Sequence, residues 1–140
     1  MQKFRFLEHT ADAKFQAFGD SLEESFFNAA LAVSSLMWDI EKVEANQTKK
    51  VYLKAKDLFQ LLCSFLEEII YLWETKGFIL KSPDNIKIKK NAGEFTLTSD
   101  FKGDKYSDKY NVYGEVKAIT YNEMKIESNE HFMVQVVVDI

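Results

Sequence analysis

The chain has 140 residues, with 18 basic and 22 acidic side chains, a formal net charge of −4 and one cysteine. This length predicts a single domain over residues 1–140, and one cysteine excludes an intrachain disulfide or a cysteine-built zinc or iron–sulfur site. We see no secretory signal and no apolar stretch approaching the roughly 20 residues of a membrane helix, so a cytoplasmic protein without a membrane partner is expected.

The first elements are two short strands. Polar and apolar residues alternate over 3–8 and 13–18, with the polar turn His9-Thr10-Ala11-Asp12 between them. Ser21 and Glu24 then stand at capping-box spacing, and apolar residues at helical spacing predict a helix from Leu22 to Met37.

A second helix follows a half-exposed strand over residues 50–56. Asp57, with Gln60 three residues later, predicts its start. Apolar residues from Leu58 to Trp73 share one face, and Gly77 ends the helix.

The rest of the chain predicts strands. We expect them at Phe78–Leu80, Ile86–Lys90, Glu94–Phe101, Val112–Thr120, Met124–Glu127 and Phe132–Asp139, with turns at 91–93 and 102–109. Two helices followed by a meander favour an α+β class: a single-domain, two-layer fold in which a largely antiparallel sheet carries both helices on one face.

The basic residues are almost all lysine, since Arg5 is the only arginine. Arginine is the side chain that nucleic-acid readers use most, so direct sequence-specific nucleic-acid binding is not expected. The lysines at 49–50 and 87–90 could form positive patches, but we interpret them as guards of exposed strand edges.

Familiar catalytic motifs are missing: the sequence has no P-loop, no glycine-rich dinucleotide turn and no His-Glu-x-x-His helix. Cys63 lies in the apolar face of the second helix without a basic neighbour, which indicates a buried structural thiol.

Acidic groups at the end of the chain are harder to explain by packing. The apolar run Val134–Val138 predicts a central strand, and it ends in Asp139-Ile140. If Ile140 is the natural end, two carboxylates adjoin there and repel unless a cation or donors lie between them. Asp12 would converge on them if the first and last strands are neighbours, and such an oxygen cluster suits calcium or magnesium. The alternative is an ordinary turn residue and a solvated strand end.

Two basic side chains accompany this cluster. His9 adjoins Asp12 in the turn, and a histidine there is commonly structural. Lys117 is predicted on the same strand face as Glu115, either as a cross-strand pair or as a functional ammonium beside the acidic cluster.

These residues resemble the archease family. The resemblance rests on His9-Thr10-Ala11-Asp12, Gly19–Glu24 with Ala29-Ala30, Phe65-Leu66-Glu67-Glu68, Glu115–Tyr121 and Val138-Asp139-Ile140, in that order along the whole chain. Asn122 departs from the pattern, in which histidine follows Thr-Tyr, so no role is assigned to it.

The resemblance implies a non-enzymatic activator of an RtcB-type tRNA-splicing RNA ligase. Such a protein promotes guanylylation of the ligase, supports its multiple turnover and broadens its nucleotide use. It also implies a metal site, usually described as calcium, at Asp12, Asp139 and Ile140. Lys117 would be the motif lysine that contacts the ligase or its nucleotide, and His9 a further contact.

Two alternatives remain open from the residues alone. Asp12, Asp139 and His9 around a bound water could form a metal-dependent phosphoester hydrolase. The chain could also be a general chaperone or modulator of RNA-processing proteins.

Overall fold

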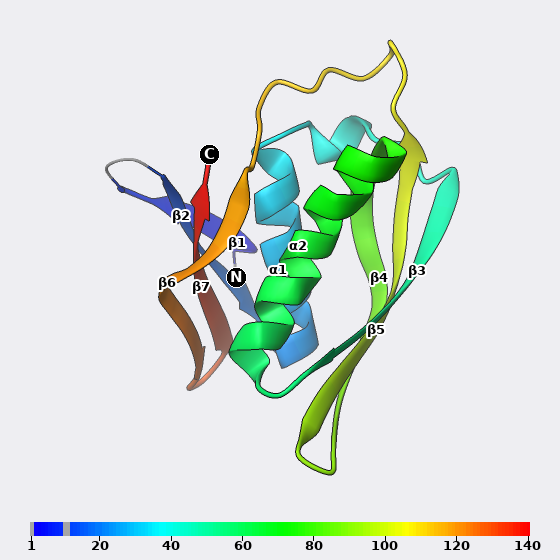
Figure 1. The fold of residues 1–140 in the computed structure, drawn as a ribbon. Coiled ribbons are helices and arrows are strands. Elements are labelled where there is room, and N and C mark those ends of the chain that lie inside the picture. Colours follow the sequence, from blue (N-terminus) through cyan, green and yellow to red (C-terminus); the bar gives the residue numbers. More distant parts are fainter. Residues whose placement is uncertain (1, 10–11) are drawn as a thin grey trace.

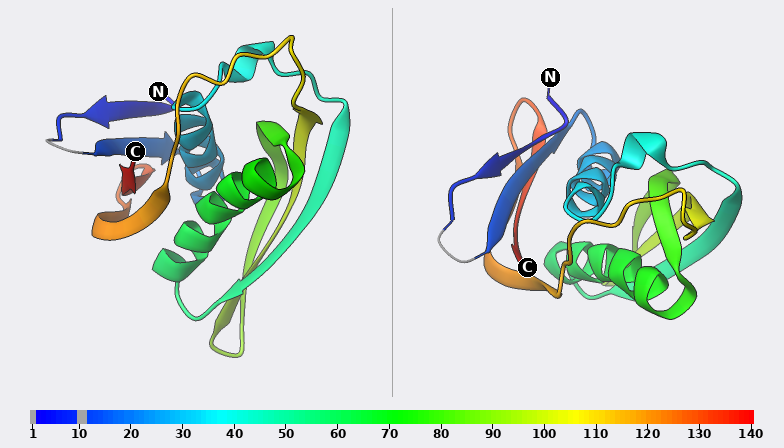
Figure 2. Two further views of the ribbon diagram at one scale, coloured as in Figure 1. Left: turned by 45° about the horizontal axis from the view of Figure 1, so that its top comes forward. Right: turned by 90° about the horizontal axis from the view of Figure 1, so that it is seen from above.

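The computed structural model describes residues 2–9 and 12–140. The strands form two antiparallel sheets, and the two long helices lie between them (Figures 1 and 2). The predicted α+β class with two helices packed on antiparallel strands is confirmed. The prediction of a single sheet is wrong, because the strands form two sheets, one of four strands and one of three.

The four-stranded sheet joins the two ends of the chain. Its order is β1 (Phe4–Leu7), β2 (Ala13–Gly19), β7 (Phe132–Asp139) and β6 (Ala118–Ser128). As predicted from its apolar run, β7 is central, and its residues from Val134 to Val138 are buried.

The three-stranded sheet comes from the middle of the chain. Its order is β3 (Gln47–Ala55), β5 (Glu94–Lys105) and β4 (Phe78–Asn91). β4 was predicted as two strands but is one, with irregularities between Leu80 and Ser82 and between Asp84 and Lys87. Pro83 is tolerated inside it because β4 is an edge strand.

Both helices begin and end largely as predicted. In α1 (Leu22–Ser35), Ser21 Oγ accepts a hydrogen bond from the Glu24 N–H at 3.0 Å. In α2 (Leu58–Lys76), Asp57 Oδ1 accepts one from the Gln60 N–H at 2.8 Å. Gly77 ends α2 with a φ of 62°, a left-handed conformation that favours glycine. Within the described part of the chain, no helix is long and apolar enough to cross a membrane.

The helices explain why there are two sheets. α1 packs against β2 and β7 on one side and against β4 on the other, and α2 likewise contacts β6 as well as β3 and β4. α1 is buried around most of its circumference, so one sheet could not cover it. One core runs through the helix layer, where the Phe65 ring lies 5.6 Å from that of Phe26 and 5.7 Å from that of Phe101.

A crossing segment, residues 106–117, connects the two sheets over the ends of the helices (Figure 1). Most of the strand predicted at Val112–Thr120 is therefore absent, since β6 begins only at Ala118, and β5 extends into the predicted turn. Val112 forms an isolated bridge with Trp38, and the Tyr113 N–H donates to the Met37 carbonyl at 2.9 Å.

The path of the crossing segment depends on Gly114. A Cβ added there would lie 2.1 Å from the Leu36 carbonyl oxygen, which is backbone and cannot move aside easily. The segment delivers Lys117 to the end of β7, so this close approach also fixes where Lys117 lies.

We predict that Gly114→Ala destabilises the fold by about 3 kcal/mol, the upper end of the usual cost of overpacking. Urea denaturation would measure the loss. Ser107→Ala, an exposed change in the same segment, is the control and should leave the free energy of unfolding almost unchanged. Equal stability of the Gly114→Ala variant and the control would contradict the close approach.

Candidate functional site

The candidate site lies at the end of β7, between the 9–12 turn and the start of β6. Ala13 pairs with Val138 in the β2–β7 ladder, and this register sets position 12 across from position 139. On the other side, Ala118 pairs with Asp139, and the Lys117 N–H donates to the Asp139 carbonyl at 2.7 Å. Three segments far apart in sequence thus meet at one sheet edge, as Figure 1 shows for the C-terminus and the start of β6.

The exposure of these residues differs. Asp12 and Asp139 are half-buried, whereas Lys117 is exposed and Ile140 is 46% exposed. Thr10 and Ala11, which belong to the predicted motif, lie outside the described residues. Backbone pairing with β6 therefore holds Asp139, while the exposed Lys117 side chain can meet another molecule.

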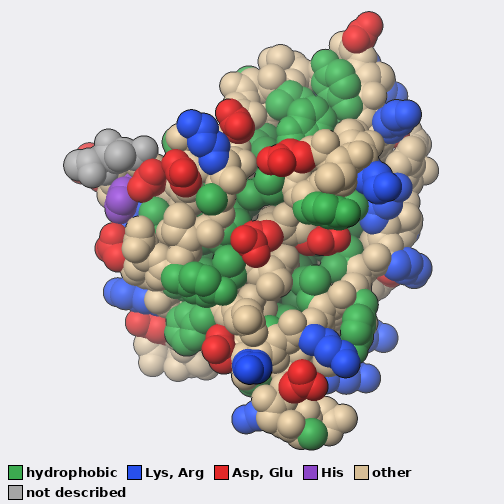
Figure 3. All heavy atoms as spheres, in the orientation of Figure 1, with side chains coloured by type: hydrophobic (Ala, Val, Ile, Leu, Met, Phe, Trp, Pro, Cys, Tyr) green, Lys and Arg blue, Asp and Glu red, His purple; other side chains and the backbone are tan. Residues whose placement is uncertain are grey.

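His9 is held by a carboxylate that the sequence analysis did not single out. Its Nε2 lies 3.2 Å from Glu123 Oε2, and Lys14 Nζ lies 3.0 Å from Glu123 Oε1. The other ring nitrogen, Nδ1, is buried, has no hydrogen-bond partner among residues 2–9 and 12–140, and lies 3.9 Å from Asp12 Oδ2. Figure 3 shows acidic side chains gathered beside a histidine on this side of the molecule.

Glu123 reaches His9 because β6 is irregular there. The β6–β7 register shifts between Thr120 and Lys125, and Glu123 has a φ of 54°. Its carbonyl accepts a hydrogen bond from Gln135 Nε2 at 2.7 Å, which ties the irregular stretch to β7. The hydrogen bond from Lys14, followed by the one from His9, lowers the pKa of the Glu123 carboxyl. The sequence signal that could have pointed to Glu123 is the pair of polar residues at 122–123, which interrupts the apolar pattern of the strand.

A polar chain supports this arrangement across the outer face of the sheet. Arg5 Nη2 donates to Gln16 Oε1 at 2.7 Å, and Gln16 Nε2 donates to Gln135 Oε1 at 3.0 Å. With the bond from Gln135 to the Glu123 carbonyl, the chain links all the strands from β1 to β6.

The ligand atoms that the site offers are of the type that a hard cation prefers. Asp12, Asp139 and, if the chain ends there, the Ile140 carboxylate offer oxygen ligands, which calcium prefers. Nδ1 of His9, which no described residue hydrogen-bonds, is a further buried polar atom beside Asp12. Residues 2–9 and 12–140 contain no group of three or more His, Cys, Asp and Glu side chains that could hold a metal ion. Side chains alone therefore do not complete a cage, and backbone, terminal or foreign oxygens would have to contribute.

Comparisons with known proteins assign nearly the whole chain to one family. The profile of the "Archease protein family (MTH1598/TM1083)" matches residues 4–140. The chain belongs to the archease family. It is 38% identical to the protein archease of Methanosarcina mazei, over 99% of this chain and 97% of that protein. It is 36% identical to that of Pyrococcus furiosus over all of both chains.

The archease fold is also seen in a solved structure. The solution structure of Methanobacterium thermoautotrophicum protein 1598 superposes with a TM-score of 0.85, at 32% identity, and covers 100% of both chains.

Two further predictions can be compared with the structure of this chain. Cys63 is buried, and burial raises the pKa of its thiol, which supports the structural interpretation. Lys117 does not share a strand with Glu115, because both precede β6. The prediction that Lys117 and Glu115 share one face of a strand is therefore wrong. Lys117 lies instead beside the end of β7, where its N–H bonds to Asp139.

We predict that Glu123→Gln destabilises the protein in a pH-dependent way. The folded-state pKa of Glu123 lies below its ordinary value of 4.5, so the carboxylate stabilises the fold above that value. The contribution is lost as the pH falls through the folded-state pKa. Thermal melts from pH 7 downward should show the wild type and variant converging in acid.

Glu127→Gln, an exposed change on the same strand, is the control and should differ little from the wild type at any pH. A gap between wild type and Glu123→Gln that stays constant into acid would contradict the ion pairs.

Proposed function

We propose that this protein activates an RtcB-type tRNA-splicing RNA ligase in the cytoplasm. In this role it promotes guanylylation of the ligase, supports its multiple turnover and broadens its use of nucleotides, without catalysing a reaction itself. The observation that carries the proposal is the convergence of Asp12, Asp139 and Lys117 at one sheet edge in a member of the archease family.

The edge suits insertion into a partner better than capture of a small substrate. Its functional groups come from strand ends and a turn, and Lys117 projects from the last residues of the crossing segment. A carboxylate pair beside an exposed ammonium can meet a phosphate-binding cleft, which carries both positive charge and bound anions. Association should accordingly be faster at low ionic strength.

Each residue has a distinct part in the proposal. Asp12, Asp139 and the Ile140 carboxylate would hold a divalent ion, which we propose to be calcium; when bound, such an ion supplies positive charge that orients neighbouring anionic groups. Lys117 would contact a carboxylate or phosphate of the ligase or its nucleotide. His9, held by Glu123, would be the second contact.

We expect Asp12→Asn and Asp139→Asn each to lower stimulation of the ligase at least tenfold, because each removes one of the carboxylates that meet there. The assay is multiple-turnover RNA ligation by a cognate RtcB-type ligase with each variant added. Asp108→Asn, an equal charge change at an exposed position of the crossing segment, should stimulate like the wild type.

The outcomes of this assay separate the alternatives. Stimulation that survives in both site variants would show that these carboxylates are not needed for the function. No stimulation by the wild type, together with phosphoester hydrolysis by the isolated protein that is lost on chelation, would favour a hydrolase. Binding of many unrelated clients would favour a chaperone.

We expect Lys117→Ala to abolish stimulation while leaving calcium binding, measured by calorimetry, unchanged. The backbone N–H of Lys117, which bonds Asp139, is kept in the variant, so the edge should stay assembled. Lys125→Ala, an exposed lysine on β6, is the matched control. Parallel losses of calcium binding and stimulation in Lys117→Ala would show that the side chain only supports the site.

A further inference from the structure

A second charged surface lies on the other sheet, facing away from the helices. We call it the lysine face; it comprises the outward side chains of β3, β5 and β4. Alternate residues of these strands, such as Val51 and Leu97, are buried against the helices, so their neighbours point outward. The outward lysines are Lys50, Lys54, Lys87, Lys89 and Lys102. Figure 3 shows basic side chains gathered along the β3 side of the molecule.

The strand register aligns this face in rows. Tyr52 stands across from Thr98, which stands across from Lys87. In the next row, Lys54 is opposite Thr96, and Thr96 is opposite Lys89. Each row therefore places lysine, hydroxyl and, in one case, an aromatic ring side by side within about 10 Å.

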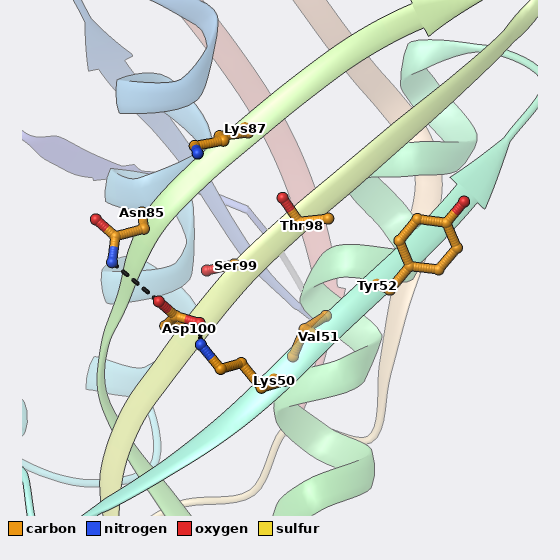
Figure 4. A pocket seen from close by; sticks show the side chains of 8 residues that line it. All are labelled: Lys50, Val51, Tyr52, Asn85, Lys87, Thr98, Ser99 and Asp100. Carbon is orange, nitrogen blue, oxygen red and sulfur yellow. Dashed lines mark hydrogen bonds and ion pairs between the residues drawn. The ribbon is translucent and has the colours of Figure 1, made fainter.

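Charge on the lysine face is only partly neutralised. Lys50 Nζ lies 2.7 Å from Asp100 Oδ1, and Asn85 Nδ2 donates to Asp100 Oδ2 at 2.9 Å (Figure 4). The other acidic residues at outward positions are Asp84, Glu94 near the β4–β5 turn, and Asp104, whose carboxylate accepts hydrogen bonds from Tyr110 and Asn46. Among the described residues, no salt bridge includes Lys54, Lys87 or Lys89.

The same region is hollowed and carries an exposed ring. Lys50, Tyr52, Lys87 and Thr98 are among the residues lining a hollow of about 470 Å³ (Figure 4). Tyr52 is 59% exposed, flanked on its own strand by lysines. Lysines alone would suit protection of the sheet edges β3 and β4, but an exposed tyrosine between them adds a surface on which a planar group can stack.

We propose that the lysine face binds single-stranded RNA without reading its sequence. Lys54, Lys87 and Lys89 would contact phosphates as point charges, which needs no arginine. Tyr52 would stack on one base, as aromatic side chains do on other single-strand binders. The low overall charge argued against nucleic-acid binding, but that sum conceals a face on which positive charge prevails. This proposal does not depend on the ligase, because binding can be measured with the isolated protein.

Fluorescence anisotropy with a labelled oligouridine of 12 nucleotides tests the proposal. Three phosphate contacts predict a slope of about −2 for log affinity against log salt. Lys54→Gln/Lys87→Gln should reduce the slope to about −0.7. Tyr52→Ala should weaken binding roughly tenfold at an unchanged slope, and Tyr52→Phe should bind like the wild type. Thermal melts of the variants should match that of the wild type, because these positions are exposed.

The matched control removes the same charge elsewhere. Lys3→Gln/Lys125→Gln changes exposed lysines near the other sheet and should bind RNA like the wild type. Equal weakening by the control pair would overturn the proposal by showing a response to net charge alone. No binding at low salt would also overturn it, as would equally tight binding of polyglutamate, which would assign the face to acidic protein segments.

Discussion

β7 pairs with β2 on one side and with β6 on the other, and the candidate site depends on these two ladders. The β2–β7 ladder joins residues more than a hundred positions apart and sets position 12 across from position 139. On the opposite side of β7, the Lys117 N–H bonds to the Asp139 carbonyl. Because side chains alternate along a strand, a slip of one residue would turn every side chain to the other face. The buried apolar residues of β7 make that slip costly, and packing in the core thereby fixes the chemistry at the edge.

The two sheets give the molecule two different surfaces. One sheet ends in half-buried carboxylates and an exposed lysine, and the other presents the lysine face, with the helix layer between them. The formal net charge of −4 conveys neither feature. A protein that offers an acidic edge to a ligase and a basic face to RNA could contact an enzyme and its substrate together. The electrostatic forces at both surfaces would weaken with added salt.

Local signals in the sequence predicted the helices and the central strand well. Ser21, Asp57 and Gly77 act through hydrogen bonds and backbone conformations that involve near neighbours, so sequence spacing alone reveals them. Asp12 and Asp139 could be proposed as partners because each interrupts an otherwise ordinary pattern. Placing positions 12 and 139 across from each other required one further condition, adjacency of β2 and β7, which the structure supplies.

Features that depend on pairing over long distances could not be predicted. The division into two sheets follows from burial of α1 on both sides, which a helical periodicity does not reveal. Glu123 contacts His9 only because β6 is irregular at that point. The crossing segment was predicted as a strand from its sequence, whereas in the structure it packs at Gly114 against the Leu36 backbone. The sequence analysis noted the lysines at 49–50 and 87–90 as possible patches but could not show that lysines of three strands share one face, because that depends on strand register.

The central claim is that the start of β2, the end of β7 and the start of β6 form one site for a hard divalent cation. Paramagnetic broadening by substoichiometric Mn²⁺ in NMR spectra of the ¹⁵N-labelled protein tests it most directly. The account predicts that the amide signals of Ala13, Lys117 and Asp139 broaden first and together, and that calcium restores them. Broadening that begins elsewhere, for example around Asp84 and Asp100, or that spreads evenly over all exposed carboxylates, would contradict it.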